Sequence, residues 1–130
     1  METKQVKPSF EDRRGIIKDI LVNEPIEHVT VITSKRGAVR GNHYHKETIQ
    51  WMYIHSGRLE YLAQKGNEKI ASHILEAGDL VKTETFEKHA FKSLEDSIFY
   101  VFTRGPKVEG DHISDTYRLT TPLHDLLERQ

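Results

Sequence analysis

Short runs of alternating hydrophobic and polar residues follow one another through most of the chain. β-Branched, aliphatic and aromatic residues gather in short runs, several of them at alternating positions, and Gly, Asn, Asp or charged pairs bound most of the runs. A period of two with such punctuation is typical of β-strands rather than helices. Strands are therefore expected over residues 15–21, 27–34, 37–45, 48–57, 58–64, 69–78, 79–84, 89–94 and 97–105.

The regular spacing of these short strands indicates an all-β fold, an antiparallel sandwich or barrel. Residues 64–69, QKGNEK, read as a hairpin turn in which Gly66 and Asn67 supply positive φ. The chain of 130 residues is long enough for one hydrophobic core, and the sequence shows neither an internal repeat nor a domain boundary. We therefore expect a single domain over residues 1–130.

The C-terminal region breaks the strand pattern. Residues 104–118 read as a long loop that returns to order near Tyr117. Thr121 and Pro122 then suit the cap and the first turn of a short helix. The apolar face of this helix would carry Leu123, Leu126 and Leu127. We expect that face to pack on the barrel or on a partner subunit.

Charge and composition narrow the classes of partner. Nineteen basic residues nearly balance twenty acidic ones, for a net charge of −1, which argues against nucleic acid or an anionic membrane as a partner. The chain has no cysteine, so disulfides and thiolate metal sites are excluded. The N-terminal residues resemble no signal peptide, and no run approaches the ~20 apolar residues of a membrane span. A soluble, cytoplasmic protein is expected.

Histidines gather in the stretch GNHYHKETIQ. Within a strand, His43 and His45 point to the same face because side chains alternate. The polar residues after them suit a turn, which would bring Gln50 on the returning strand beside the pair. Much later in the chain, His89 and Phe91 share a face of another strand. If the sheet curls into a small barrel, these four polar groups meet in a cavity that suits one small ligand.

The strand that carries Gln50 presents Trp51 and Tyr53 on its opposite face. An aromatic pair facing outward from a small barrel indicates a subunit interface, and we expect a homodimer. The alternative is packing against a second layer of strands or the C-terminal helix. The remaining histidines are interpreted as bystanders, although the one in the loop EGDHISD could contact a ligand at the rim: His28, His55, His73, His112 and His124.

The histidine-rich stretch resembles the first sequence motif of the cupins, G-x5-H-x-H-x3,4-E-x6-G. Gly37 corresponds to its first glycine, His43 and His45 to its histidine pair, and Gly57 to its last glycine. Gln50 stands where cupins usually have glutamate. The resemblance implies a cupin-type antiparallel jelly-roll barrel, here with a short C-terminal helix.

The stretch GDLVKTETFEKHAF resembles the second cupin motif. Gly78 corresponds to its opening glycine and His89 to its histidine. The proline and glycine that usually precede this histidine are missing, and Glu87 and Lys88 stand in front of it instead. The two motifs together cover residues 37–93.

A narrower resemblance concerns enzymes of activated sugars. RGNHYHKETIQ is similar to the R-G-x-H-A-H-K-x-x-x-Q stretch of cupin 3,4-ketoisomerases that act on nucleotide-linked 4-keto-6-deoxysugars. The matching residues are Arg40, Gly41, His43, His45, Lys46 and Gln50. FEDRRG near the N-terminus is similar to the opening of these ketoisomerases and of the related 3,5-epimerases. RGNHYH is equally close to the zinc-containing cupin domain of capsule-sugar enzymes.

The ketoisomerase resemblance implies metal-free proton transfer on a nucleotide sugar. His43 would be the base, with His45 as a relay or second acid, because histidine titrates near neutral pH. Arg40 or Gln50 would hold the oxyanion that develops on the substrate.

The metal-containing branch implies a different role for the same residues. His43, His45 and His89 would donate nitrogen to one divalent ion, and Gln50 would donate its amide oxygen. Zinc, nickel, iron or manganese would each suit such a site. An amide would hold the ion less tightly than glutamate but leave more of its charge to polarise a carbonyl.

Two other functions remain open at this point. A metal-dependent dioxygenase is one, although the usual iron site includes a carboxylate and the inferred ligand set contains none unless Glu47 joins it. A non-catalytic cupin that binds a small ligand is the other, because one fold serves many functions.

Overall fold

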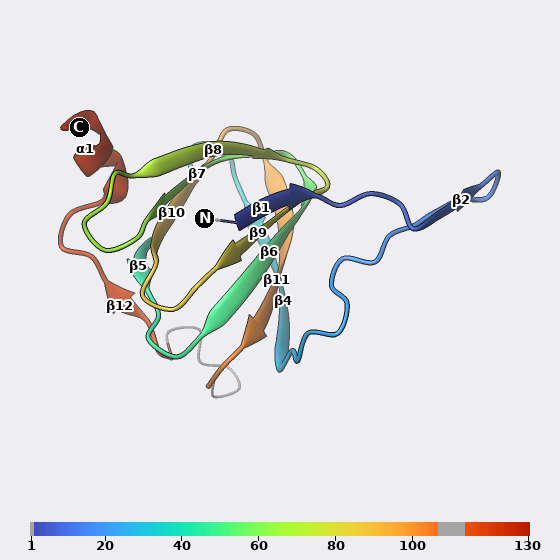
Figure 1. Ribbon diagram of the computed structural model, residues 1–130. Helices are drawn as coiled ribbons and strands as arrows, with labels where there is room; N and C mark the ends of the chain where they lie inside the picture. The colour runs from blue at the N-terminus through green and yellow to red at the C-terminus, as the bar shows by residue number, and fades with distance from the viewer. Residues whose placement is uncertain (1, 107–113) are drawn as a thin grey trace.

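The computed structural model describes residues 2–106 and 114–130 and contains two five-stranded antiparallel sheets that enclose a barrel (Figure 1). A two-stranded hairpin projects from the barrel and a short helix lies on the opposite side. In chain order the elements are β1 (Glu2–Gln5), β2 (Phe10–Asp12), β3 (Gly15–Ile17), β4 (His28–Ser34), β5 (Val39–Tyr44), β6 (Ile49–Ser56), β7 (Arg58–Gln64), β8 (Ala71–Glu76), β9 (Asp79–Thr83), β10 (Lys88–Ser93), β11 (Ser97–Arg104), β12 (Tyr117–Arg118) and α1 (Leu123–Glu128).

The two sheets are ordered β1-β9-β6-β11-β4 and β12-β5-β10-β7-β8, and β2 pairs only with β3. This arrangement confirms the all-β, antiparallel jelly-roll expectation. Each strand predicted between residues 27 and 105 corresponds to one of β4 to β11, whereas the run at 15–21 is a strand only in β3. The turn between β7 and β8 has positive φ at Gly66 (54°) but not at Asn67, contrary to the prediction for both.

The hydrophobic core lies between the inner faces of the two sheets. Alternate residues of β6, such as Met52 and Ile54, pack there against Tyr61, Phe91 and Phe99 from the other strands. Ile54 and Phe99 are fully buried. The period of two along the sequence therefore marks the inner face correctly.

The outer face of β6 carries a second apolar cluster. Trp51 and Tyr53 are only 5% and 7% exposed, because they pack with Val6, Leu80 and partly buried residues of the N-terminal segment such as Ile20. The chain itself covers this aromatic pair with an irregular N-terminal segment, which is neither a second layer of strands nor the C-terminal helix. The pair therefore no longer argues for a homodimer, and the dimer stays a prediction.

The C-terminal helix packs on the barrel as expected, through fully buried Leu123. It begins one residue later than predicted, because Pro122 is the N-cap and no residue of the helix start supplies a side-chain cap. Instead the Leu123 amide donates to Oδ1 of Asn42 in β5, at 2.8 Å. Thr121 is therefore not the cap. Within residues 2–106 and 114–130, no helix is long and apolar enough to cross a lipid bilayer.

Candidate active site

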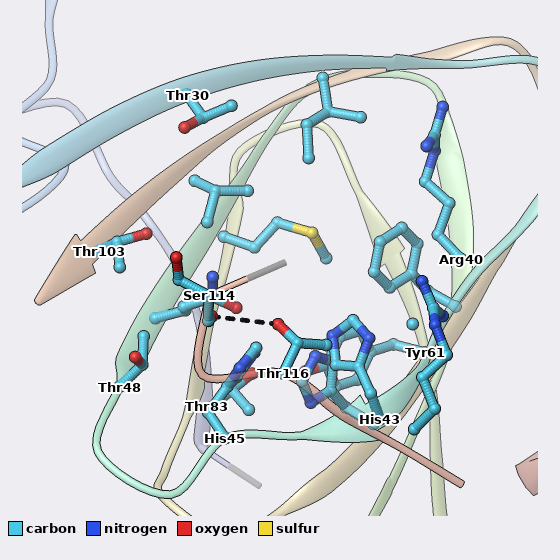
Figure 2. A pocket seen from close by; sticks show the side chains of 18 of the residues that line it. Thr30, Arg40, His43, His45, Thr48, Tyr61, Thr83, Thr103, Ser114 and Thr116 are labelled. Carbon is cyan, nitrogen blue, oxygen red and sulfur yellow. Dashed lines mark hydrogen bonds between the residues drawn. The ribbon is translucent and has the colours of Figure 1, made fainter. Parts of the chain in front are cut away.

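A cavity of about 540 Å³ lies between the two sheets, lined by side chains from both (Figure 2). Three histidines, two arginines, one glutamine, several threonines and a set of apolar residues form its wall. None of the described residues that line it is Asp or Glu. The described part of the cavity wall therefore combines cationic, hydroxyl and apolar surface and contributes no carboxylate.

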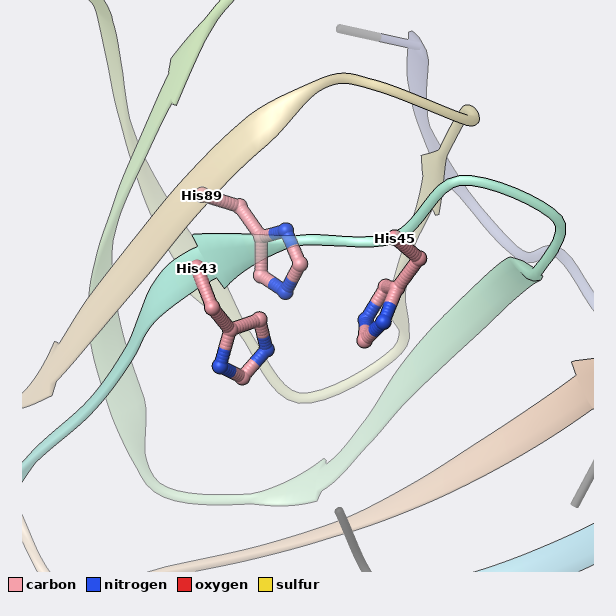
Figure 3. A group of neighbouring side chains, drawn as sticks. All are labelled: His43, His45 and His89. Atoms are coloured by element: carbon pink, nitrogen blue, oxygen red, sulfur yellow. The ribbon is translucent and has the colours of Figure 1, made fainter. Parts of the chain in front are cut away.

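His43, His45 and His89 come together inside this cavity, as the sequence predicts (Figure 3). The ring centroids are 4.9 Å apart for His43 and His45, 4.6 Å for His43 and His89, and 5.3 Å for His45 and His89. One nitrogen from each ring lies within 4.8 Å of the others. His45 and His89 are each only 4% exposed. The three rings thus form one buried cluster.

Strand pairing explains this convergence. β5 and β10 are antiparallel neighbours in which His89 is opposite His43, while Ala90 is opposite Gly41, so that Asn42 is an extra residue in β5. Gly41 and Asn42 have φ of 88° and 58°, as in a β-bulge. A Cβ on Gly41 would lie 2.8 Å from the carbonyl oxygen of His89, so this position requires glycine.

The bulge affects both the cavity lining and the position of α1. Its extra residue, Asn42, accepts hydrogen bonds from the backbone amides of Leu119 and Leu123. The bulge also changes the side-chain alternation along β5, so that Arg40 and His43, three residues apart, both line the cavity.

In His45 and in His89, a backbone carbonyl oxygen contacts Nδ1, which leaves Nε2 of each ring for a ligand. Nδ1 of His45 lies 2.8 Å from the carbonyl oxygen of Asp115, which only accepts, so Nδ1 carries the proton. Nδ1 of His89 lies 3.3 Å from the carbonyl oxygen of Glu87. Nε2 of His45 and Nδ1 of His43 are buried and have no hydrogen-bond partner among the described residues. Buried nitrogens without partners are uncommon and indicate that a ligand completes the site.

The surroundings keep two of the rings neutral. Burial lowers the pKa of His43 to about 4, and the nearby His45 and Arg118 contribute. Burial also lowers the pKa of His89 to about 3, with further contributions from His43 and His45. Neutral imidazoles have a free lone pair at physiological pH, so this donor set fits a divalent metal ion.

Two further predicted residues reach the same cavity. Gln50 lines it from β6, and Arg40 lines it from β5. Nε of Arg40 donates to the Ser34 hydroxyl at 3.3 Å, and Nη2 donates to the Thr33 carbonyl at 3.1 Å, so this guanidinium is held in place. The metal-ligand role of Gln50 and the catalytic role of Arg40 stay predictions.

Arg118 is a cavity residue that the sequence did not single out. It lies on β12 opposite His43 and makes no ion pair with the described residues. No sequence pattern indicated Arg118, because it ends the stretch 104–118 that reads as a loop. Its charge is available to an anionic ligand.

Asp115 is the second residue that sequence reasoning missed. Its carboxylate accepts hydrogen bonds from the turn between β5 and β6, and its carbonyl contacts His45. Burial raises the pKa of this carboxyl, but hydrogen bonds from the Glu47 amide, the Thr48 hydroxyl and the Lys46 amide outweigh it and lower the pKa. The sequence around Asp115 is typical of a loop, and nothing in it indicates these contacts.

The turn before His89 contains a residue in an unusual backbone conformation. The backbone has positive φ at Phe86 (63°), not at Glu87 or Lys88, so a bulky residue occupies a conformation that favours glycine. The Phe86 amide donates to the carbonyl of His45 at 2.6 Å, which connects this turn to the histidine cluster.

The other histidines lie outside the cavity lining, as expected for bystanders. His55 and His73 are exposed on β6 and β8, and His28 lies on β4. His124 contacts Glu60 at 3.0 Å. His112, a candidate rim residue, lies outside the described residues.

A comparison with protein-family models gives a match to the cupin domain over residues 30–103. The match spans more than half of the chain and includes all three histidines of the cluster. The protein belongs to the cupin family. No curated protein matches this cupin in sequence at a significant level.

Solved structures similar to this cupin include enzymes of sugar metabolism. ChmJ, a 3'-monoepimerase from Streptomyces bikiniensis in complex with dTDP-quinovose, superposes with a TM-score of 0.78 at 18% identity over 96% of this chain and 71% of its own. The QdtA 3,4-ketoisomerase from Thermoanaerobacterium thermosaccharolyticum, a double mutant in complex with TDP, has a TM-score of 0.69 at 19% identity over 97% and 89%.

A third neighbour is CapF, a capsular polysaccharide assembling protein from Staphylococcus aureus. Its TM-score is 0.63 at 21% identity, over 86% of this chain and 34% of CapF. At these identities the three structures share the jelly-roll fold with this cupin.

Proposed function

We propose that this cupin isomerises or epimerises a nucleotide-linked keto-sugar by histidine-mediated proton transfer. The observation that supports this most is the cluster of His43, His45 and His89, which lines a cavity of about 540 Å³ together with two arginines. ChmJ and QdtA, which share its fold, are an epimerase and a ketoisomerase crystallised with dTDP-quinovose and TDP.

The chemistry follows from the acidity of a proton next to a carbonyl. In a 4-keto-sugar, a base takes the proton from C3, and the electrons of that C–H bond form an enediolate across C3 and C4. Return of a proton at C4, with loss of the hydroxyl proton at O3, gives the 3-keto isomer; return at C3 from the opposite face gives the epimer. His43 is neutral at physiological pH and acts as the base, with His45 as the second proton carrier.

The arginines bind the negative charges of such a substrate. Arg40 is fixed by Ser34 and Thr33, so it suits an oxyanion that develops at a defined point. Arg118 has no ion-pair partner among the described residues and suits the diphosphate of a nucleotide.

A divalent metal is compatible with the same cluster. His43, His45 and His89 would hold it with their free nitrogens, and Gln50 would complete the set. When bound, such an ion polarises the substrate carbonyl as a Lewis acid. The dioxygenase alternative gains no support, because the described lining contains no carboxylate to complete its usual ligand set.

The test is conversion of substrate. Purified protein is incubated with dTDP- and UDP-linked 4-keto-6-deoxysugars, and proton NMR follows the sugar ring. We expect a 3-keto or epimeric product from wild type and from His73→Asn, a histidine exposed on β8, but not from His43→Asn. If no keto-sugar changes although nucleotide sugars raise the melting temperature, the protein binds without catalysing.

We propose a homodimer as the working assembly. Trp51 and Tyr53 do not support it, because the chain itself buries both side chains. Exposed valines on the outer face of edge strand β4, Val29 and Val31, remain available for a contact. Light scattering coupled to gel filtration decides the matter, and a mass of 15.1 kDa at micromolar concentration would exclude a stable dimer.

A further inference from the structure

Asp115 accepts hydrogen bonds from four successive residues, 45 to 48, the first of which is His45 of the histidine cluster. Its carboxylate binds the backbone amides of Lys46 and Glu47 at 3.1 and 2.9 Å and the hydroxyl of Thr48 at 2.8 Å. Its carbonyl binds Nδ1 of His45 at 2.8 Å. One residue thus connects the segment before β12 to the whole turn between β5 and β6.

The backbone of Asp115 lies in the left-handed region, with φ of 52°. This conformation is unfavourable for residues other than glycine, although Asp and Asn tolerate it best. Such a conformation persists where surrounding contacts determine it. The contacts here are the four hydrogen bonds, three of them made by the side chain.

The contact with the carbonyl determines the chemistry of His45. Because a carbonyl oxygen only accepts, Nδ1 of His45 must donate, and the lone pair of the neutral ring is then on Nε2. That Nε2 is buried and unpartnered among the described residues, and the ring lies 4.9 Å from His43 and 5.3 Å from His89. The opposite tautomer would present an N–H to the cluster instead of a lone pair.

We infer that Asp115 is a positioning residue: its carboxylate holds the β5–β6 turn so that its own carbonyl fixes His45 with Nε2 free toward His43 and His89. Orientation of a histidine through its other nitrogen is a general device for ligand and acid–base histidines. The inference concerns the same site as the proposed function, but it does not depend on the sugar reaction. It applies equally to proton transfer and to metal binding.

The test observes the tautomer directly. Long-range proton–nitrogen correlation NMR on the 15N-labelled full chain, at about pH 8 where imidazole is neutral, distinguishes Nδ1–H from Nε2–H rings. His45→Gln assigns the signals. Wild type is expected to show His45 as the Nδ1–H tautomer alone, and an Nε2–H ring there would overturn the inference.

Asp115→Ala removes three of the four hydrogen bonds and leaves the carbonyl in place. We expect the ratio of the two His45 tautomers to change about tenfold or more, as for loss of a hydrogen bond. Asp115→Asn, which tolerates the left-handed backbone, gives the answer if the alanine variant does not fold. The amide spectrum of each variant verifies its fold.

Asp96→Ala is the matched control. Asp96 also accepts a hydrogen bond from a turn amide, that of Arg36 at 2.9 Å, but it does not line the cavity. This variant should keep the wild-type His45 signals. Unchanged His45 signals in folded Asp115→Ala or Asp115→Asn, or an equal change in Asp96→Ala, would overturn the assignment. Loss or absence of sugar turnover alone would bear only on the proposed function.

Discussion

The ring of His89 lies edge-on to the ring of His43, with 4.6 Å between the ring centroids. The two residues are 46 positions apart in the sequence and meet because they are opposite each other in the antiparallel pair β10–β5. The geometry of that strand pair, including its bulge, therefore determines the geometry of the site.

Gly41→Ala tests the close approach beside the bulge. The new methyl group would lie 2.8 Å from the carbonyl of His89, so β10 must move, and we expect a loss of about 1–3 kcal/mol in the free energy of unfolding. Gly37→Ala is the control, because its φ of 87° nearly equals the 88° of Gly41 but no heavy atom lies within 4 Å. Urea unfolding should show the larger loss for Gly41→Ala. Equal losses would show that backbone conformation alone requires glycine at position 41.

The stability of metal-free protein should fall in acid because of the buried histidines. The pKa values of His43 and His89 are lowered from 6.5 to about 4 and about 3, so below pH 6.5 the unfolded chain binds more protons than the folded one. The stability is fully present above pH 6.5 and is lost as the pH falls toward the folded values, by up to ~1.4 kcal/mol per pH unit for each histidine.

Urea unfolding of chelator-treated protein between pH 7 and pH 4 measures this slope. His89→Gln should reduce the slope, whereas His73→Asn, a change at an exposed histidine, should leave it unchanged. If His89→Gln leaves the slope unchanged, the pKa of His89 is not lowered by folding.

Phe86 is held in an unfavourable backbone conformation, with φ of 63° and a side chain 59% exposed. Phe86→Gly and Phe86→Ala both remove the ring and its stacking on Tyr44, so their difference reports the backbone strain less the entropic cost of ordering glycine. The glycine variant should be more stable than the alanine variant by about 1 kcal/mol in thermal or urea unfolding. A more stable alanine variant would show that the strain at position 86 is smaller than the entropic cost of ordering glycine there.

Much of this site follows from the sequence because its signals are local. The period of two puts His43 and His45 on one face, and the alternation on β6 separates Met52 and Ile54 from Trp51 and Tyr53. No local pattern connects His89 to the pair; its place beside them followed from the expectation of a closed barrel and from the second cupin motif.

The features of the site that could not be predicted from the sequence depend on contacts between distant segments. Arg118 reaches the cavity because β12 pairs with β5, and a two-residue strand has no periodic signal. Asp115, just before that strand, reaches His45 through its carbonyl. Asn42 caps α1 across 81 residues, which is why Thr121 is the wrong cap. Strain at Phe86 is set by the turn around it and not by its own preference. Such features depend on packing between segments that are far apart in the sequence, and adjacent residues do not reveal them.

Gln50→Glu tests whether the amide contributes to a metal site. Addition of a negative charge to the ligand set should tighten zinc binding about tenfold or more, measured by competition with a coloured chelator. Gln64→Glu adds the same charge outside the cavity lining and should leave the affinity unchanged. Equal zinc affinity of Gln50→Glu and wild type would remove Gln50 from the ligand set.

The most direct test of the account is the entry of solvent deuterium at C3 of dTDP-4-keto-6-deoxyglucose. In heavy water, wild type and His73→Asn should introduce deuterium at C3 well above the rate without enzyme, and His43→Asn should do so at least about 100-fold more slowly. Mass spectrometry and NMR measure the label. Deuterium entry at the wild-type rate in a folded His43→Asn variant would contradict proton transfer by this histidine.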